Sequence, residues 1–146
     1  MAPDVNKIFD WGILGCGWLG RAWALDRIQA GESVWGSARR ARILSELQTD
    51  DIQPVAFDAS LEAKAVWPRC RHLLVVLPPS AGEQAFQKAA AFSHDCDWTV
   101  LISSTSVYPD GDGHHMEDDA VRRISPHSGV CLLDGESHFN AARTAS

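Results

Sequence analysis

The sequence has 146 residues, 45% of them hydrophobic and 22% charged, a composition typical of one soluble globular domain. Its net charge of -6 argues against a nucleic-acid-binding protein, because such proteins usually present a basic face. No apolar segment is long enough to cross a membrane, and the amino-terminal stretch lacks a signal peptide's apolar centre. The four cysteines form no C-x-x-C pair, so we expect free thiols, a cytoplasmic location and no bound metal.

Short apolar segments alternate along the chain with segments whose apolar residues have helical spacing. The apolar segments predict five strands: 11–14, 33–38, 52–58, 72–78 and 98–104. The segments between them predict four helices: 18–31, 38–50, 60–67 and 80–96. Strands that lack in/out alternation and are separated by helices indicate a parallel sheet covered on both faces. Right-handed crossovers then predict an α/β doubly wound sheet with strand order 3-2-1-4-5.

The regular pattern ends near residue 108. Residues 109–129 are polar and rich in turn-forming residues, so we expect a long loop there. Within it, His114 and His115 precede three acidic residues, and we interpret this stretch as a solvated loop rather than a metal site. The last segment, 134–146, predicts one more helix with Phe139 as its main apolar anchor.

The stretch "GCGWLG" after the first predicted strand has the spacing G-x-G-x-x-G. Gly15 would allow a tight turn, Gly17 would let a pyrophosphate approach the backbone, and Gly20 would let the helix pack close to the strand. The amides at the start of the helix, together with its dipole, attract phosphate groups. We therefore expect this segment, including Trp18 and Leu19, to bind a dinucleotide cofactor.

The end of the second predicted strand bears on the choice between NAD and NADP. Sites selective for NAD usually place an acidic residue there to bind the ribose 2′-hydroxyl, and "VWGSARRAR" contains none. Ser37, Arg39 and Arg40 would instead suit a 2′-phosphate, which favours NADP over NAD. Asp58, after the third strand, would either bind the adenine amino group or cap the next helix, and these alternatives stay open.

Two further strand ends lie at the expected ligand-binding edge. "LLVVLPPS" ends the fourth strand at Leu77, Pro78 and Pro79, which either border the cofactor or form a rigid turn. "LISSTSVY" carries several hydroxyl side chains at the end of the fifth strand, where Ser or Thr would donate hydrogen bonds to a substrate carbonyl or hydroxyl.

Together, "GILGCGWLG", "LLVVLPPS" and "ISSTSVYPDGDG" resemble the extended short-chain dehydrogenase/reductase family, that is, the NAD-dependent epimerase/dehydratase relatives, and most closely members with a G-x-G-W-L-G turn. The resemblance covers about residues 8–131. It implies a Rossmann-type NAD(P)-binding domain of an oxidoreductase or a nucleotide-sugar-epimerase-like protein. It also implies that Ser104, four residues before Tyr108, orients the substrate oxygen.

The sequence departs from this family in two ways. His127 stands where the family has its catalytic Tyr, and Cys131 stands where it has its Lys, so His127 is only a second catalytic candidate. We also expect residues 1–146 to form a cofactor domain without the family's substrate-binding lobe, which leaves the small-molecule substrate unknown. The alternative is a non-catalytic NAD(P)-binding or redox-sensing module. An exposed sheet edge would also allow pairing into a homodimer.

Overall fold

The computed structural model describes residues 4, 6–57, 67–109, 113–120 and 128–144. Five parallel strands form one sheet in the order β3-β2-β1-β4-β5, which confirms the predicted topology. The strands are β1 (Phe9–Leu14), β2 (Val34–Ala38), β3 (Gln53–Ala56), β4 (Cys70–Val75) and β5 (Trp98–Leu101). The α-helices are α1 (Trp18–Gln29), α2 (Ala41–Thr49), α3 (Glu83–Ser93) and α4 (Ser128–Thr144). Short 3₁₀ turns occur at η1 (Pro79–Ala81), η2 (Thr105–Val107) and η3 (Glu117–Asp119).

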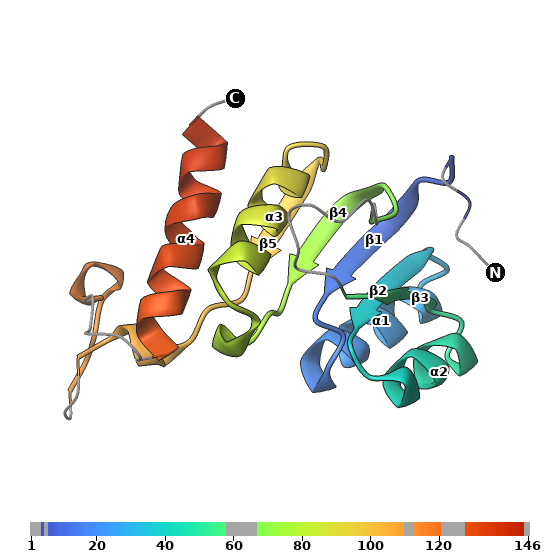
Figure 1. Cartoon of the computed structure of the whole chain (residues 1–146), viewed down its shortest axis with the longest axis horizontal. Coiled ribbons are helices and arrows are strands. Elements are labelled where there is room, and N and C mark those ends of the chain that lie inside the picture. The colour runs from blue at the N-terminus through green and yellow to red at the C-terminus, as the bar shows by residue number, and fades with distance from the viewer. Residues whose placement is uncertain (1–3, 5, 58–66, 110–112, 121–127, 145–146) are drawn as a thin grey trace.

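Helices cover both faces of the sheet, as the continuous apolar strands predict. On one face, α1 and α2 pack against the strands through Ala24 and Leu47. On the other face, α3 and α4 contribute Phe86, Leu132 and Phe139 to the larger hydrophobic core. Figure 1 shows α4 beyond β5 at one end of the molecule and α2 beside β3 at the other. The sheet is therefore doubly wound.

A glycine allows α4 to pack closely against α3. A Cβ atom placed on Gly135 would lie 2.7 Å from the ring of Phe86, which is too close for any side chain. A polar contact adds to this packing, since His138 Nε2 of α4 lies 3.3 Å from Glu83 Oε1 of α3. Ser103 Oγ, in the segment that follows β5, donates a hydrogen bond to Glu136 Oε1 and so joins α4 to the carboxyl end of β5.

The predicted boundaries of the carboxyl-terminal region are partly wrong. The loop expected to reach residue 129 ends earlier, because α4 begins at Ser128 rather than at residue 134. Gly129 and Gly135 each destabilise a helix by about 1 kcal/mol relative to Ala, so sequence patterns alone do not predict a helix that starts at Ser128. Burial of Val130 and Leu132 in the core stabilises it nevertheless. The helix predicted over residues 60–67 lies outside the described residues, except for Trp67, which is buried and not helical.

Candidate functional site

The turn between β1 and α1 requires glycine at its first position. Gly15 has a φ of +87°, and a Cβ atom there would lie 2.5 Å from the carbonyl oxygen of Val76. The end of β2 holds this turn in place. The Gly15 N–H donates to Ser37 Oγ at 3.0 Å, and the Cys16 N–H donates to the Ser37 carbonyl at 2.8 Å. The turn is therefore fixed by its neighbouring strands before any ligand binds.

The other two glycines have different surroundings. A Cβ atom on Gly20 would lie 2.6 Å from the Gly15 carbonyl oxygen, so Gly20 lets α1 pack tightly against the turn. A Cβ atom on Gly17 would meet no atom within 4 Å. Gly17 is the N-cap of α1, and neither a capping side chain nor an acidic residue in the first turn satisfies the amides there. The open space and the uncapped amides fit a bound anion.

A cavity of about 510 Å³ opens over this turn. It is lined by most of the residues that the sequence predicts for cofactor binding: Gly15, Gly17, Trp18, Leu19, Ser37, Arg39, Arg40, Leu77 and Pro78. Gly20 and Pro79 do not line it: Gly20 is buried, and the cavity wall at this strand end stops at Pro78, the residue before η1. Asp58 lies outside the described residues. The structure thus brings together, in one cavity, residues from the ends of β1, β2 and β4.

Several lining residues were not predicted from the sequence: Cys16, Ala38, Ile43, Phe57 and Val76. Phe57 directly follows β3, so its place at the carboxyl edge of the sheet was the signal that would have identified it. Cys16 is buried, and burial raises the pKa of its thiol to about 12. The Cys16 thiol therefore stays protonated at neutral pH and fills space in the turn.

Two arginines form the basic side of the cavity. Arg39 follows β2, and its guanidinium lies over the ring of Phe57 with 5.3 Å between the guanidinium carbon and the ring centroid. Arg40 is the N-cap of α2. Both side chains are exposed, and neither makes an ion pair with any residue that the structure describes. The Ser37 hydroxyl, in contrast, is fully buried and accepts the hydrogen bond from Gly15, so it supports the turn.

Ion pairs fix α2, and with it Arg40, relative to α1. Arg21 Nε lies 2.7 Å from Asp50 Oδ2, and another guanidinium nitrogen of Arg21 lies 2.9 Å from Glu46 Oε2. These side chains are partly buried, which reduces solvent screening relative to a fully exposed pair. The helix that carries Arg40 is therefore held beside the helix that begins at the glycine turn.

Comparison with known proteins gives matches of structure only. No protein-family model matches the sequence. No curated protein matches it either. Among solved structures, a conserved protein of unknown function from Silicibacter pomeroyi superimposes with a TM-score of 0.71 and 19% identity, covering 92% of this chain and 49% of that chain. The chain spans about half the length of that protein.

Two further solved structures have similar folds. A UDP-glucuronic acid 4-epimerase from Bacillus cereus, in complex with UDP-4-deoxy-4-fluoro-glucuronic acid and NAD, matches with a TM-score of 0.68 and 16% identity, covering 92% of this chain and 52% of that chain. The TrkA-N domain of the inner membrane protein ybaL from Escherichia coli matches with a TM-score of 0.53 and 14% identity, covering 66% of this chain and 76% of that domain.

The strand order and these likenesses decide the fold. The chain adopts a Rossmann-type fold. In such folds, ligands bind outside the carboxyl ends of the strands, at the point where the strand order reverses. In this Rossmann-type domain the reversal lies between β1 and β4, and the cavity is lined there by Gly15 after β1 and Leu77 after β4. Among the described residues, no helix combines the length and apolarity needed to span a membrane.

The catalytic candidate that the structure describes, Ser104, lies at the same edge of the Rossmann-type sheet, outside the glycine-turn cavity. Ser104 follows β5, is exposed, and accepts a hydrogen bond from the Ser106 N–H at 3.2 Å. Its own hydroxyl hydrogen remains for donation to another group. His127 lies outside the described residues, and Cys131 lies in the first turn of α4. Tyr108 stacks on His115, with ring centroids 5.6 Å apart.

Proposed function

We propose that the chain binds a nicotinamide dinucleotide in the cavity at the glycine turn. The observation that carries this proposal is Gly17, whose position at the uncapped start of α1 leaves open space beside free amides. The cavity lies at the reversal of strand order, where dinucleotides bind in Rossmann-type folds. The Bacillus cereus epimerase, which shares the fold, was solved with NAD. The pyrophosphate would accept hydrogen bonds from amides of the turn.

We propose NADP as the preferred cofactor. Arg39 and Arg40 follow β2, where an acidic residue would select NAD, and both face solvent beside the cavity. A guanidinium presents several N–H donors that match the oxygens of a 2′-phosphate. Because Arg39 already lies over Phe57, little side-chain ordering is needed before it binds this group. The adenine end of the cofactor would then lie on the side of the cavity formed by β2 and β3.

As for activity, we propose a domain of an oxidoreductase or an epimerase-like protein, in which the bound nicotinamide supplies hydride transfer. Ser104 would donate a hydrogen bond to the substrate oxygen, because its hydroxyl hydrogen is not used by Ser106. His127 is the second candidate, since an imidazole can exchange a proton near neutral pH. The second candidate function is a non-catalytic dinucleotide-binding module. It is favoured by His127 and Cys131, which stand where the resembling family has Tyr and Lys.

One set of measurements on the purified chain tests these proposals. Isothermal titration with NADPH, NADP⁺, NADH and NAD⁺ should give binding of all four, with the phosphorylated pair tighter. Steady-state NADPH oxidation over a panel of aldehydes and ketones then separates the two functions. Clear turnover would support catalysis by the chain itself. We expect binding with only background turnover, because His127 and Cys131 stand where the resembling family has Tyr and Lys. Absence of binding by all four nucleotides would refute the proposed site.

A further inference from the structure

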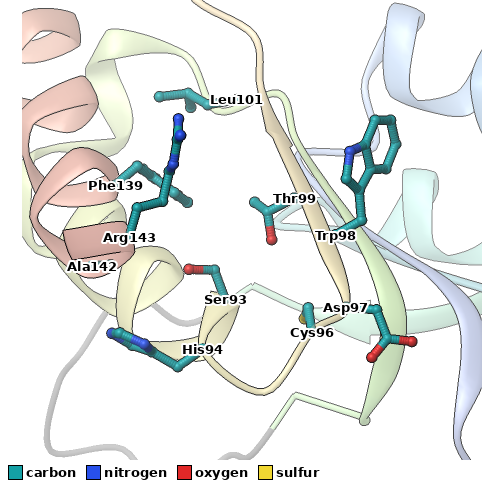
Figure 2. A pocket seen from close by; sticks show the side chains of 10 residues that line it. All are labelled: Ser93, His94, Cys96, Asp97, Trp98, Thr99, Leu101, Phe139, Ala142 and Arg143. Carbon is teal, nitrogen blue, oxygen red and sulfur yellow. The ribbon is translucent and has the colours of Figure 1, made fainter. Parts of the chain in front are cut away.

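A second cavity, of about 580 Å³, lies at the edge of the sheet opposite the glycine turn. It is bordered by the end of α3, the start of β5 and the end of α4, as Figure 2 shows. Thr99 lies on the cavity side of β5, whereas Trp98 points to the other side of the strand. Cys96, in the turn that precedes β5, lines this cavity. The proposed cofactor site uses none of these residues.

Strand pairing brings a second cysteine next to Cys96. The Sγ atoms of Cys70 and Cys96 lie 3.8 Å apart. The register pairs His72 with Trp98, and extended by two residues it places Cys70 opposite Cys96. The Asp97 N–H donates to the Arg71 carbonyl at 2.8 Å, so the hydrogen-bonded pairing with β4 already begins in the segment before β5. Neighbouring strands lie about 4.8 Å apart, within the Cα separation of about 4.4–6.8 Å found in disulfides.

The two thiols differ in burial and in acidity. Cys70 is buried, and its sulfur lies so close to Gly12 that a Cβ atom there would be 2.7 Å away. A hydrogen bond to Cys96, together with burial, raises the pKa of Cys70. The same hydrogen bond lowers the pKa of Cys96, against opposing effects of its own burial and of the carboxylates of Asp95 and Asp97. Cys96 is thus the more acidic thiol of the pair and the one that borders a cavity.

We propose that Cys96 and Cys70 form a site of reversible oxidation, at which a hydroperoxide converts the pair into an intramolecular disulfide. The reactive thiolate is Cys96, which a small peroxide reaches through the cavity. The resolving thiol is Cys70, held in contact by the pairing of β4 with the segment before β5. The disulfide would join the start of β4 to the turn that follows α3.

The reaction takes place in two balanced steps. In the first, the Cys96 thiolate attacks one oxygen of hydrogen peroxide; an S–O bond forms, the O–O bond breaks, and the released hydroxide takes up a proton to become water. In the second, the Cys70 sulfur attacks the Cys96 sulfenic acid; the S–S bond forms, the S–O bond breaks, and the hydroxyl leaves with the Cys70 proton as water. Overall, the two thiols lose two electrons and two protons, and the peroxide takes them up to give two waters.

The other two cysteines serve as internal controls. Cys16 is buried in the glycine turn, and its pKa of about 12 makes it unreactive at neutral pH. Cys131 lies in α4 and is half-buried. We therefore expect peroxide to consume Cys96 faster than Cys131, because the hydrogen bond with Cys70 lowers the pKa of Cys96 and so favours its reactive thiolate.

The test treats the reduced full chain with one equivalent of hydrogen peroxide, alkylates the remaining thiols, and maps the peptides by mass spectrometry. The expected product has lost two hydrogens, contains a peptide pair cross-linked through Cys70 and Cys96, and reverts with dithiothreitol. Cys70→Ser should leave Cys96 as a sulfenic acid that dimedone traps, whereas Cys16→Ser should form the same disulfide as the parent. Circular dichroism confirms that each variant is folded.

Several results would overturn the proposal. One is a disulfide that includes Cys131 or joins two chains. Another is Cys96 reacting no faster than Cys131, or no faster than it does in the urea-unfolded chain. A third is a folded Cys70→Ser variant whose Cys96 gives no dimedone adduct. Nucleotide binding is not part of this readout, so failure of the proposed cofactor site would leave the outcome unaffected.

Discussion

Replacement of Gly17 by valine separates the role of this residue in binding from its role in folding. A Cβ atom at Gly17 meets no atom within 4 Å, and its φ of -82° is one that any residue adopts. The cost to folding should therefore stay near that of an unfavourable N-cap residue, about 1 kcal/mol. The isopropyl group would instead occupy the space that a pyrophosphate needs beside the amides of α1.

The loss of affinity follows from the hydrogen bonds displaced. If two amides donate to the pyrophosphate, each bond to a charged group contributes about 1.5–3 kcal/mol. Losing both weakens binding by about 3–6 kcal/mol, or roughly 10²- to 10⁴-fold at 1.4 kcal/mol per tenfold change. Isothermal titration with NADPH measures this loss, and urea unfolding measures the stability. Ala91→Val, at an exposed position of α3, is the control for adding the same side chain elsewhere.

Gly15→Ala should mainly lower folding stability, whereas Gly17→Val should mainly weaken nucleotide binding. Its φ of +87° and the 2.5 Å approach of a Cβ atom to the Val76 oxygen predict a loss of folding stability of about 3 kcal/mol. That corresponds to a melting temperature roughly 6–12 °C lower. The reasoning fails if Gly17→Val binds NADPH within threefold of the parent. It also fails if Gly17→Val is destabilised as strongly as Gly15→Ala.

Three further predictions concern the cofactor, the chemistry and the acid stability. Changing Arg39 and Arg40 together to alanine should lower the affinity for NADP⁺ at least tenfold more than the affinity for NAD⁺ in calorimetry, because only NADP⁺ carries the 2′-phosphate. Equal losses of affinity would exclude a contact between these arginines and the 2′-phosphate. The parent chain should oxidise NADPH with carbonyl substrates only at a background rate; clear turnover that both Ser104→Ala and His127→Ala abolish would show that His127 acts as the acid. Hydrogen bonds from the backbone N–H and the hydroxyl of Ser33 lower the pKa of Asp10. The contribution of ionised Asp10 to folding stability is therefore present above about pH 4 and is lost as the pH falls through the lowered pKa. Asp10→Asn should therefore reduce unfolding free energy at pH 7 and lose that difference under acid, and a constant difference would contradict this assignment.

The sequence by itself predicts the features of this protein that depend on residues close together along the chain. A strand buried on both faces is apolar nearly throughout, and in this sequence segments with helical spacing of apolar residues separate such strands, so the order of elements and the doubly wound sheet were predictable. The spacing of Gly15, Gly17 and Gly20 likewise predicted the turn, since only a residue without a side chain fits a positive φ against a neighbouring carbonyl. The helix at 128–144 was only partly predicted, because its glycines oppose helix formation and packing against α3 stabilises it.

Tertiary structure decided the contacts that depend on register between distant segments. The sequence places Ser37 beside the predicted phosphate site, but only strand pairing shows that its hydroxyl is buried and accepts a hydrogen bond from the Gly15 N–H. Phe57 reaches the cavity because β3 ends at the same edge as β2. Cys70 and Cys96 are 26 residues apart, with nothing in their spacing to suggest a pair. Only the parallel register of β4 and β5 brings their sulfurs into contact, because residues meet across a sheet according to hydrogen-bond pairing and not according to distance along the chain.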